Sequence, residues 1–135
     1  INWTPYTDNN KELVPILTSR KKMFDSHVVE PGPPAILTSK GIVLLYNGKN
    51  AETEDADPAL PKGIYCGGQA LFDAKQPEKL LERCATYFIK PDLPHEIKGQ
   101  YTSGTTFIEG LVYFKKQYFL YYGTADSMVG VAIKK

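Results

Sequence analysis

The sequence predicts an all-β fold, and three observations support this prediction. Tyr, Pro and Gly are abundant, with nine, ten and eleven residues in a chain of 135. Apolar residues show almost no helical periodicity. Short runs of β-branched and aromatic residues instead alternate with clusters of Pro, Gly and polar residues at fairly regular intervals. This spacing is typical of a β-sandwich, a β-barrel or the blades of a β-propeller.

Each predicted strand is a short apolar run that ends at a turn signal. The first, residues 35–38, follows a Pro-Gly-Pro-Pro turn, and the polar pair Ser39-Lys40, followed by Gly41, separates it from the second, residues 42–46. A single short helix is predicted at residues 76–83, because Pro77 stands near its start and acidic residues precede basic ones. The remaining strands are predicted at residues 63–70, 106–114, 118–122 and 129–133.

Length and composition limit the class of protein. A chain of 135 residues, 42% apolar and 23% charged, is typical of one soluble globular domain. The formal net charge is +1, and Arg20-Lys21-Lys22 is interpreted as a solvated turn, so nucleic acid is not an expected partner. No apolar segment approaches the roughly 18 residues of a membrane span. We expect a soluble protein, cytoplasmic or periplasmic, with no membrane partner.

The cysteines and histidines give little support for metal chemistry. Cys66 and Cys84 have a spacing that fits no zinc pattern, and we interpret both as buried thiols in preference to a disulfide. His27 and His95 are isolated in the sequence, and each is interpreted as a surface or hydrogen-bonding histidine. We expect no metal site and no cofactor.

An internal repeat favours propeller blades among the all-β folds. Glu30 follows a valine and precedes Pro31-Gly32, a predicted hairpin and then Tyr46-Asn47-Gly48. Glu109 stands between an isoleucine and a glycine, ahead of a second predicted hairpin and Tyr121-Tyr122-Gly123. A unit that recurs with an insertion between its copies is typical of a propeller. Equivalent positions of different blades lie at the same end of the central channel, so Glu30 and Glu109 are expected to face one cavity.

Three motifs, in order, resemble glycoside hydrolase family 130, which contains β-mannoside phosphorylases and β-mannosidases. They are VEPGPPAILTSKGIVLLYNG, YCGGQALFDAKQPEKLLER and FIEGLVYFKKQYFLYYGTADSMVGVA. The resemblance extends from about Asn2 to the C-terminus. It implies a five-bladed β-propeller of which residues 1–135 form the C-terminal blades. The N-terminal blades of the same propeller are then the expected partner, and a homo-oligomer stays open.

The resemblance also implies an inverting attack on a β-mannosidic bond in the central cavity. The family's general acid is an aspartate of the N-terminal half, so this portion alone is expected to be inactive. In the phosphorylases, the segment that matches residues 28–32 reads KIGAG, and its lysine binds phosphate; here that position is Val28. Their next strand ends in YHG, with a phosphate-binding histidine where this chain has Asn47. Their FPCG segment corresponds to FIEG, which contains Glu109.

Two phosphate-binding groups are therefore replaced, and two carboxylates are present. Carboxylates repel a phosphate dianion, but a carboxylate can abstract a proton from an attacking water. We predict a β-mannosidase-like glycosidase with Glu30 and Glu109 as catalytic residues. Phosphorolysis that releases mannose 1-phosphate stays the alternative.

Further residues are predicted to bind the oligosaccharide substrate. Asp126 matches a family aspartate that contacts mannose, and Tyr46 and Tyr122 can stack on a pyranose ring. For Asp126 the alternative is a turn-capping aspartate, and for the tyrosines it is the core. Asp25 and Ser26 can hydrogen-bond sugar hydroxyls, and their alternative is a local Asx- or ST-turn. The full predicted substrate-binding set is Asp25, Ser26, Tyr46, Asn47, Tyr122 and Asp126.

Two non-catalytic classes stay open as well. A carbohydrate-binding propeller would contain the same blades without the general acid. A sandwich-type sugar-binding module is a weaker alternative, because the repeat is blade-like. The mannoside linkage, the aglycone and the compartment are not determined by the sequence.

Overall fold

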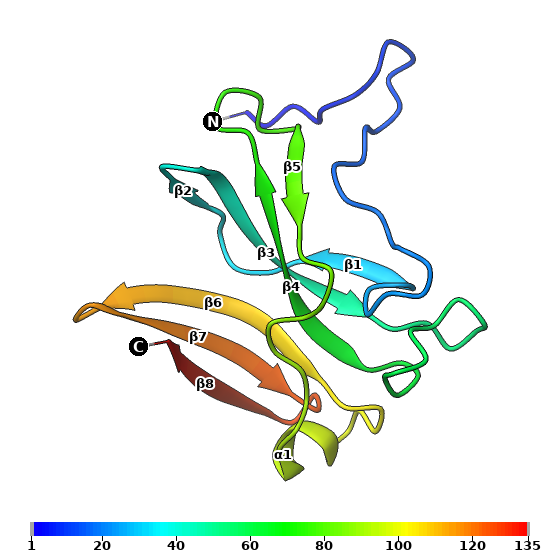
Figure 1. The fold of residues 1–135 in the computed structure, drawn as a ribbon. Helices are drawn as coiled ribbons and strands as arrows, with labels where there is room; N and C mark the ends of the chain where they lie inside the picture. Colours follow the sequence, from blue (N-terminus) through cyan, green and yellow to red (C-terminus); the bar gives the residue numbers. More distant parts are fainter. Residues whose placement is uncertain (1, 135) are drawn as a thin grey trace.

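The structure, a computed structural model, describes residues 2–134 and consists almost entirely of β-strands (Figure 1). The strands form two antiparallel sheets, which confirms the all-β prediction. Sheet 1 contains β1 (Val28–Pro31), β2 (Ile36–Thr38), β3 (Gly41–Lys49), β4 (Tyr65–Phe72) and β5 (Leu80–Arg83). Sheet 2 contains β6 (Thr106–Phe114), β7 (Gln117–Thr124) and β8 (Met128–Lys134), and the short helix α1 (Pro94–Ile97) lies in the connection between the sheets.

Sheet 1 has four strand positions although it contains five strands. Both β1 and β2 pair with β3, β1 opposite residues 46–49 and β2 opposite residues 41–43. Gly32, Pro33, Pro34 and Ala35 interrupt this shared position, because proline lacks the N–H that a paired strand donates. The order β1-β3-β4-β5 is therefore that of a simple antiparallel meander.

All six predicted strands are present, one predicted helix is wrong, and one strand was not predicted. Residues 106–114 form β6 with the predicted bounds, and the other predicted strands are extended or trimmed by a few residues. The helix predicted at residues 76–83 is absent: Leu80–Arg83 is strand β5, paired with β4. Residues 28–31, for which no strand was predicted, form strand β1.

The two faces of sheet 1 have different neighbours. Side chains opposite one another in an antiparallel pair share a face, and successive residues alternate. Tyr46, Cys66 and Phe72 lie on one face, where Phe24 from the preceding segment packs against them. Leu45 lies on the other face and packs against Ile108 and Leu120 of sheet 2. The second face of sheet 1 is therefore the one turned toward sheet 2.

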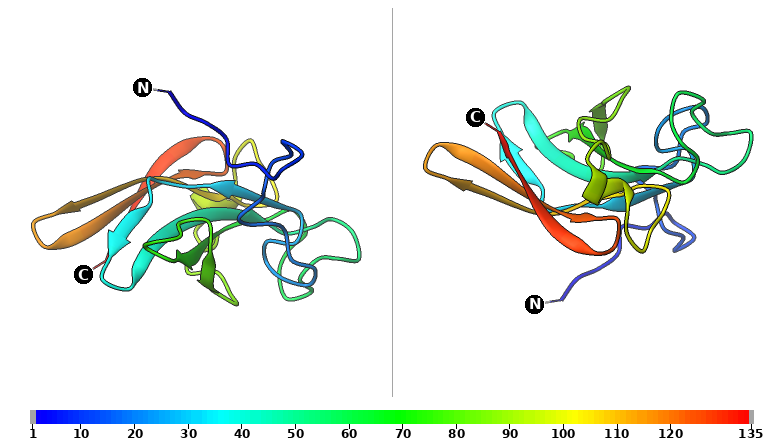
Figure 2. Two further views of the ribbon diagram at one scale, coloured as in Figure 1. Left: turned by 90° about the horizontal axis from the view of Figure 1, so that it is seen from above. Right: turned by 90° about the horizontal axis from the view of Figure 1, so that it is seen from below.

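Sheet 2 is apolar on both faces. Its inner face, with Ile108, Leu120 and Tyr122, packs toward sheet 1. The outer face is uncovered, although antiparallel sheets usually present polar residues to water. Figure 2 shows that the β6–β7 hairpin also projects beyond sheet 1. The exposed residues of this outer face are Val112, Phe114, Tyr121, Val129, Val131 and Ile133.

The basic run and the cysteines are only partly as predicted. Lys21 and Lys22 are exposed, but Arg20 is half-buried and forms an ion pair, so its interpretation as a solvated residue is wrong. Both cysteines are free thiols, with Cys66 buried and Cys84 half-buried. No helix within residues 2–134 is long and apolar enough to cross a membrane.

Candidate functional site

Glu30 lies within β1, directly opposite Asn47 of β3, on the face of sheet 1 turned toward sheet 2. Its Oε2 atom is buried and has no hydrogen-bond partner among residues 2–134. An unpaired buried carboxylate oxygen is costly, because desolvation is not repaid by a hydrogen bond. The few such atoms in a protein often have a functional role. Glu30 is therefore the first candidate for chemistry.

The turn after Glu30 is fixed by close packing. The Gly32 N–H donates to the Leu45 carbonyl at 3.1 Å. A Cβ atom at Gly32 would lie 2.8 Å from that carbonyl oxygen and 3.1 Å from Ile108 Cγ1. Glycine is therefore required by this close approach, while Pro31 and Pro33 restrict the backbone on either side. The turn holds the end of β1, and with it Glu30, against both β3 and β6.

Tyr65 and Lys49 set the electrostatic surroundings of Glu30. Burial raises the pKa of Tyr65 to about 12, and the negative charge of Glu30 and a hydrogen bond with its carboxylate add to this shift. The Lys49 ammonium lies 5.9 Å from the centroids of both the Tyr65 and Tyr101 rings. It forms an ion pair with Glu52 at 3.2 Å.

Asn47 links the strand that carries Glu30 to the strand that carries Glu109. Its side-chain nitrogen donates to the Ile108 carbonyl at 3.0 Å and to the Pro31 carbonyl at 3.3 Å. The Ile108 N–H donates to Asn47 Oδ1 at 2.7 Å. Asn47 is fully buried, so its amide is occupied by backbone groups of β1 and β6.

Glu109 follows Ile108 directly and occupies a β-bulge. Ile108 pairs with Tyr122 and Gly110 with Tyr121, so Glu109 is the extra residue and has no partner on β7. Its side chain is exposed. Bulges commonly redirect a side chain next to a functional site. The structure thus brings the backbones at Glu30, Asn47 and Glu109 together, and the convergence of their side chains on one pocket stays a prediction.

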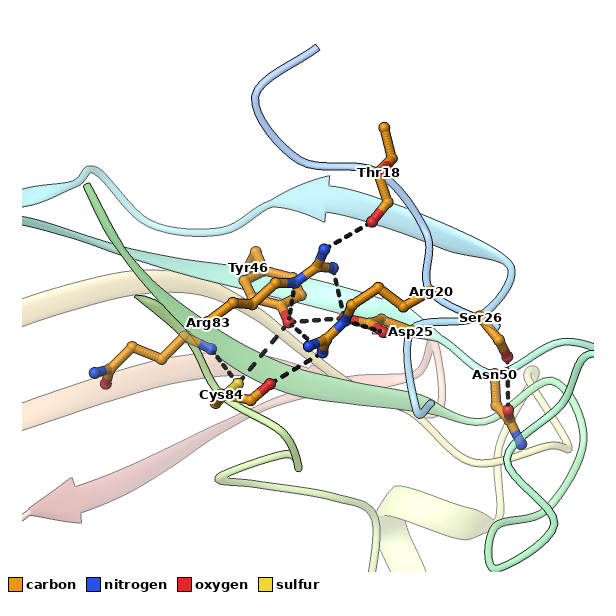
Figure 3. A network of polar contacts seen from close by, with 9 residues as sticks. Thr18, Arg20, Asp25, Ser26, Tyr46, Asn50, Arg83 and Cys84 are labelled. Atoms are coloured by element: carbon orange, nitrogen blue, oxygen red, sulfur yellow. Dashed lines mark hydrogen bonds and ion pairs between the residues drawn. The ribbon is translucent and has the colours of Figure 1, made fainter. Parts of the chain in front are cut away.

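Asp25 and Tyr46 lie on the opposite face of sheet 1, in a charged network (Figure 3). Arg20 donates to both carboxylate oxygens of Asp25, at 3.1 and 2.8 Å, and Arg83 donates to Oδ2 at 2.5 Å. The Tyr46 hydroxyl donates to the same Oδ2 at 2.8 Å and accepts from Arg83 Nε at 3.0 Å. Burial, with the neighbouring carboxylate, raises the pKa of Tyr46. The network ties the segment before β1 to β3 and β5.

Sequence reasoning missed both arginines of this network. Arg20 is part of a basic run, and Arg83 ends a segment whose local pattern predicts a helix. Burial acts to lower the pKa of Arg20, but the hydrogen bond and charge of Asp25 outweigh it, so the pKa is raised. The partners of Arg83 are distant in sequence, and no local pattern indicates them.

The other three predicted binding residues are Ser26, Tyr122 and Asp126. Ser26 is buried; its hydroxyl donates to Asn50 Oδ1 at 3.0 Å and accepts from the Ala51 N–H. Tyr122 is buried, and its hydroxyl donates to Glu96 Oε1 at 2.7 Å. Burial, followed by this contact, raises the pKa of Tyr122 to about 12. Asp126 is exposed in the β7–β8 turn, with a positive φ of 53°.

Two clefts open beside sheet 1, and neither is lined by Glu30 or Glu109. The first, about 460 Å³, is lined by residues of β2, β3, β4 and β5 and of the turn between β2 and β3. Its polar lining residues include Lys40, Gln69 and Glu82. The second, about 550 Å³, lies between the two sheets and is mostly apolar, with Phe88 and Tyr118 in its wall. Within residues 2–134, no group of three or more His, Cys, Asp or Glu side chains is placed to hold a metal ion.

Comparison with known proteins identifies relatives of this chain. The family model described as β-1,4-mannooligosaccharide phosphorylase matches residues 2–135. A β-1,2-mannobiose phosphorylase of Thermoanaerobacter sp. (strain X514) is 28% identical over 117 residues, which are 87% of this chain and 35% of that protein. The chain therefore spans about a third of the length of this curated relative.

Solved structures agree with this match. One belongs to work reporting that the family of mannoside phosphorylases contains glycoside hydrolases that target β-1,2 mannosidic linkages in Candida mannan. It is 49% identical with a TM-score of 0.95, over 98% of this chain and 37% of that chain. A β-1,2-mannobiose phosphorylase from Listeria innocua is 31% identical with a TM-score of 0.72, over 88% of this chain and 31% of that chain. The chain belongs to glycoside hydrolase family 130.

Proposed function

We propose that this chain forms the C-terminal blades of a five-bladed β-propeller that hydrolyses β-mannosidic bonds of manno-oligosaccharides with inversion. Glu30 acts as the general base that removes a proton from the attacking water. Glu109 orients that water or a sugar hydroxyl. The general acid comes from the N-terminal blades, as the family resemblance implies.

The observation that carries this proposal is the unpaired carboxylate oxygen of Glu30. A base must keep a lone pair free for the proton that it abstracts, and Oε2 is buried without a partner among residues 2–134. The rigid turn at Gly32 holds it in place, which limits the reorganisation needed for reaction. The nearby Lys49 is paired with Glu52, so Glu30 is not neutralised by a salt bridge to it.

Water is favoured over phosphate as the nucleophile by the position of the cationic and hydrogen-bond-donating groups. Binding a phosphate dianion requires cationic or strongly donating groups, and both arginines of the chain lie on the other face of sheet 1. Asn47, which replaces a histidine of the phosphorylases, is buried and occupied by backbone groups. The identity of 49% to the structure from the work on hydrolases of this family, against 31% to the Listeria innocua phosphorylase, supports the same choice.

The outer face of sheet 2 supports the proposal that further blades complete the fold. A sheet that is apolar on both faces needs a covering layer on each. In the longer relatives, about two thirds of the polypeptide lies outside the region matched by this chain. The proposed partner of this face is therefore the rest of the propeller, and a second copy of the chain is the alternative.

The test uses the complete polypeptide that contains these residues, with β-1,2- and β-1,4-mannobiose as substrates in phosphate-free buffer. Free mannose is the expected product, and proton NMR of the first turnovers should show the α-anomer. Glu30→Gln should lower kcat by roughly 10²–10⁴-fold, the usual contribution of a general base. Glu109→Gln should lower it less.

Phosphate provides the discriminating condition. Addition of phosphate should leave the rate of mannobiose cleavage unchanged. Mannose 1-phosphate as the main product would establish the phosphorylase alternative, which is the activity of the curated relative. Binding of mannobiose without any cleavage would indicate a carbohydrate-binding propeller. An active Glu30→Gln variant would show that Glu30 is not the base.

A further inference from the structure

Asn47 makes three hydrogen bonds, and all three are to the backbone. It accepts one bond from the Ile108 N–H at 2.7 Å and donates one to the Ile108 carbonyl at 3.0 Å. This reciprocal pair is the one that a backbone amide of a neighbouring strand would make. The third bond, to the Pro31 carbonyl at 3.3 Å, reaches the residue after Glu30. The Asn47 side chain thus joins β3 and the end of β1 to Ile108 of β6, while Tyr65 of β4 is hydrogen-bonded to Gly104 and Thr106 around the start of β6.

We infer that Asn47 is a positioning residue that sets the distance between the two carboxylates. Its backbone lies opposite Glu30, and its side chain holds Ile108, the residue before Glu109. β1 and β6 belong to different sheets. The Asn47 amide links them directly, because it donates to the carbonyls of Pro31 in β1 and Ile108 in β6. This inference rests on the proposed function. It replaces the predicted contact of Asn47 with sugar by a role in alignment.

The position requires an amide specifically. The Ile108 N–H needs an acceptor, and the two carbonyls of Ile108 and Pro31 need a donor. Aspartate supplies the acceptor only, and its charge would face two carbonyl oxygens. Leucine has a similar volume but supplies neither. Asn47 is fully buried, so water does not replace the lost bonds.

Asn50 provides a matched control just after the end of the same strand. It is also fully buried, and its Oδ1 accepts from the Asp57 N–H at 2.8 Å. Its side-chain nitrogen donates to carbonyls of residues 57, 60 and 61. Asn50→Asp therefore removes the same donor as Asn47→Asp, but it loosens the loop before β4 and leaves the contact with β6 intact.

The first measurement compares kcat and KM of the two variants in the complete enzyme. Asn47→Asp should lower kcat by about 10–100-fold relative to Asn50→Asp, because an error of about 1 Å in a reacting group has this effect. KM should change by less than about twofold. Equal losses in the two variants would overturn the inference. A KM raised more than about tenfold with kcat preserved would also overturn it, since Asn47 would then contact the substrate.

The second measurement does not depend on activity. Amide hydrogen exchange over residues 105–110 should accelerate in Asn47→Leu and stay slow in Asn50→Leu, because only the first variant releases Ile108. Unchanged exchange in Asn47→Leu overturns the inference whatever the kinetics. Absence of mannoside cleavage in the wild type overturns the proposed function instead, and the exchange result then decides whether the link between sheets exists.

Discussion

Replacement of Asp25 by asparagine tests the charged network on the face of sheet 1 turned away from sheet 2. Asp25 is fully buried and accepts four hydrogen bonds, two from Arg20, one from Arg83 and one from Tyr46. The asparagine side chain would keep the shape but present an NH₂ group to donors. It would also leave two guanidinium groups without their shared counter-ion.

The expected loss of stability follows from the burial of the partners. Removal of one member of a buried ion pair costs about 3–5 kcal/mol. Arg83 is 8% exposed, but Arg20 is 26% exposed and can regain some water, so we expect a value near the lower end, about 3 kcal/mol. The matched control is Asp55→Asn, whose partner Lys21 is 80% exposed. A surface pair of this kind contributes about 1 kcal/mol or less.

Urea unfolding of the complete polypeptide measures this difference. With an m-value of about 2 kcal/mol/M, Asp25→Asn should lower the midpoint by about 1.5 M and Asp55→Asn by less than about 0.5 M. Equal midpoints in the two variants would refute the reasoning. A normal midpoint with a strongly raised KM for mannobiose would show instead that Asp25 binds sugar, as the sequence predicts.

Two further predictions concern glycine packing and alkaline pH. Gly68→Ala should destabilise the protein by about 1–3 kcal/mol, because its Cβ would lie 2.4 Å from the buried Tyr46 ring. The control Gly123→Ala should be nearly neutral, because no atom lies closer than 3.8 Å to its Cβ. Similar urea midpoints for the two variants would contradict this prediction. Burial raises the pKa values of Tyr65 and Tyr122 to about 12, so the folded state retains protons that the unfolded chain releases near its ordinary pKa of about 10. Stability should therefore be intact below about pH 10 and fall between about pH 10 and 12, and this fall should flatten when both tyrosines are replaced by phenylalanine. An unchanged slope would contradict the assigned pKa shifts.

Local sequence patterns predicted the strands that are bounded by clear turn signals. Residues 106–114 are the best case, since the Lys115-Lys116 turn and the apolar runs on both sides indicate a hairpin. The pattern failed at Leu80–Arg83, where proline and charge order favoured a helix, but pairing with β4 determined the structure. Helix α1 does have a local signal: Pro94 at its first position and Glu96, which accepts the N–H groups of Asp92 and Leu93.

The site was harder to predict because its contacts are long-range. The repeat indicated similar positions for Glu30 and Glu109, and each lies on a strand that pairs with the strand carrying its aromatic and glycine residues. It gave no sign that β1 and β6 are joined through Asn47, or that Asp25 faces away from Glu30. Hydrogen bonds between residues more than fifty positions apart, such as Arg83 to Asp25, leave no periodicity in the sequence.

The bulge at Glu109 separates the chemistry of this position from the packing of sheet 2. Ile108 and Leu111 both pack in the core of sheet 2 although they are three positions apart, an odd spacing that regular alternation does not allow. The extra residue resets the alternation and is itself excluded from both the ladder and the core. Substitution at position 109 is therefore nearly neutral for folding, whereas deletion would turn every later side chain of β6 to the wrong face. A change of side chain at position 109 can therefore alter activity without disturbing the packing of sheet 2.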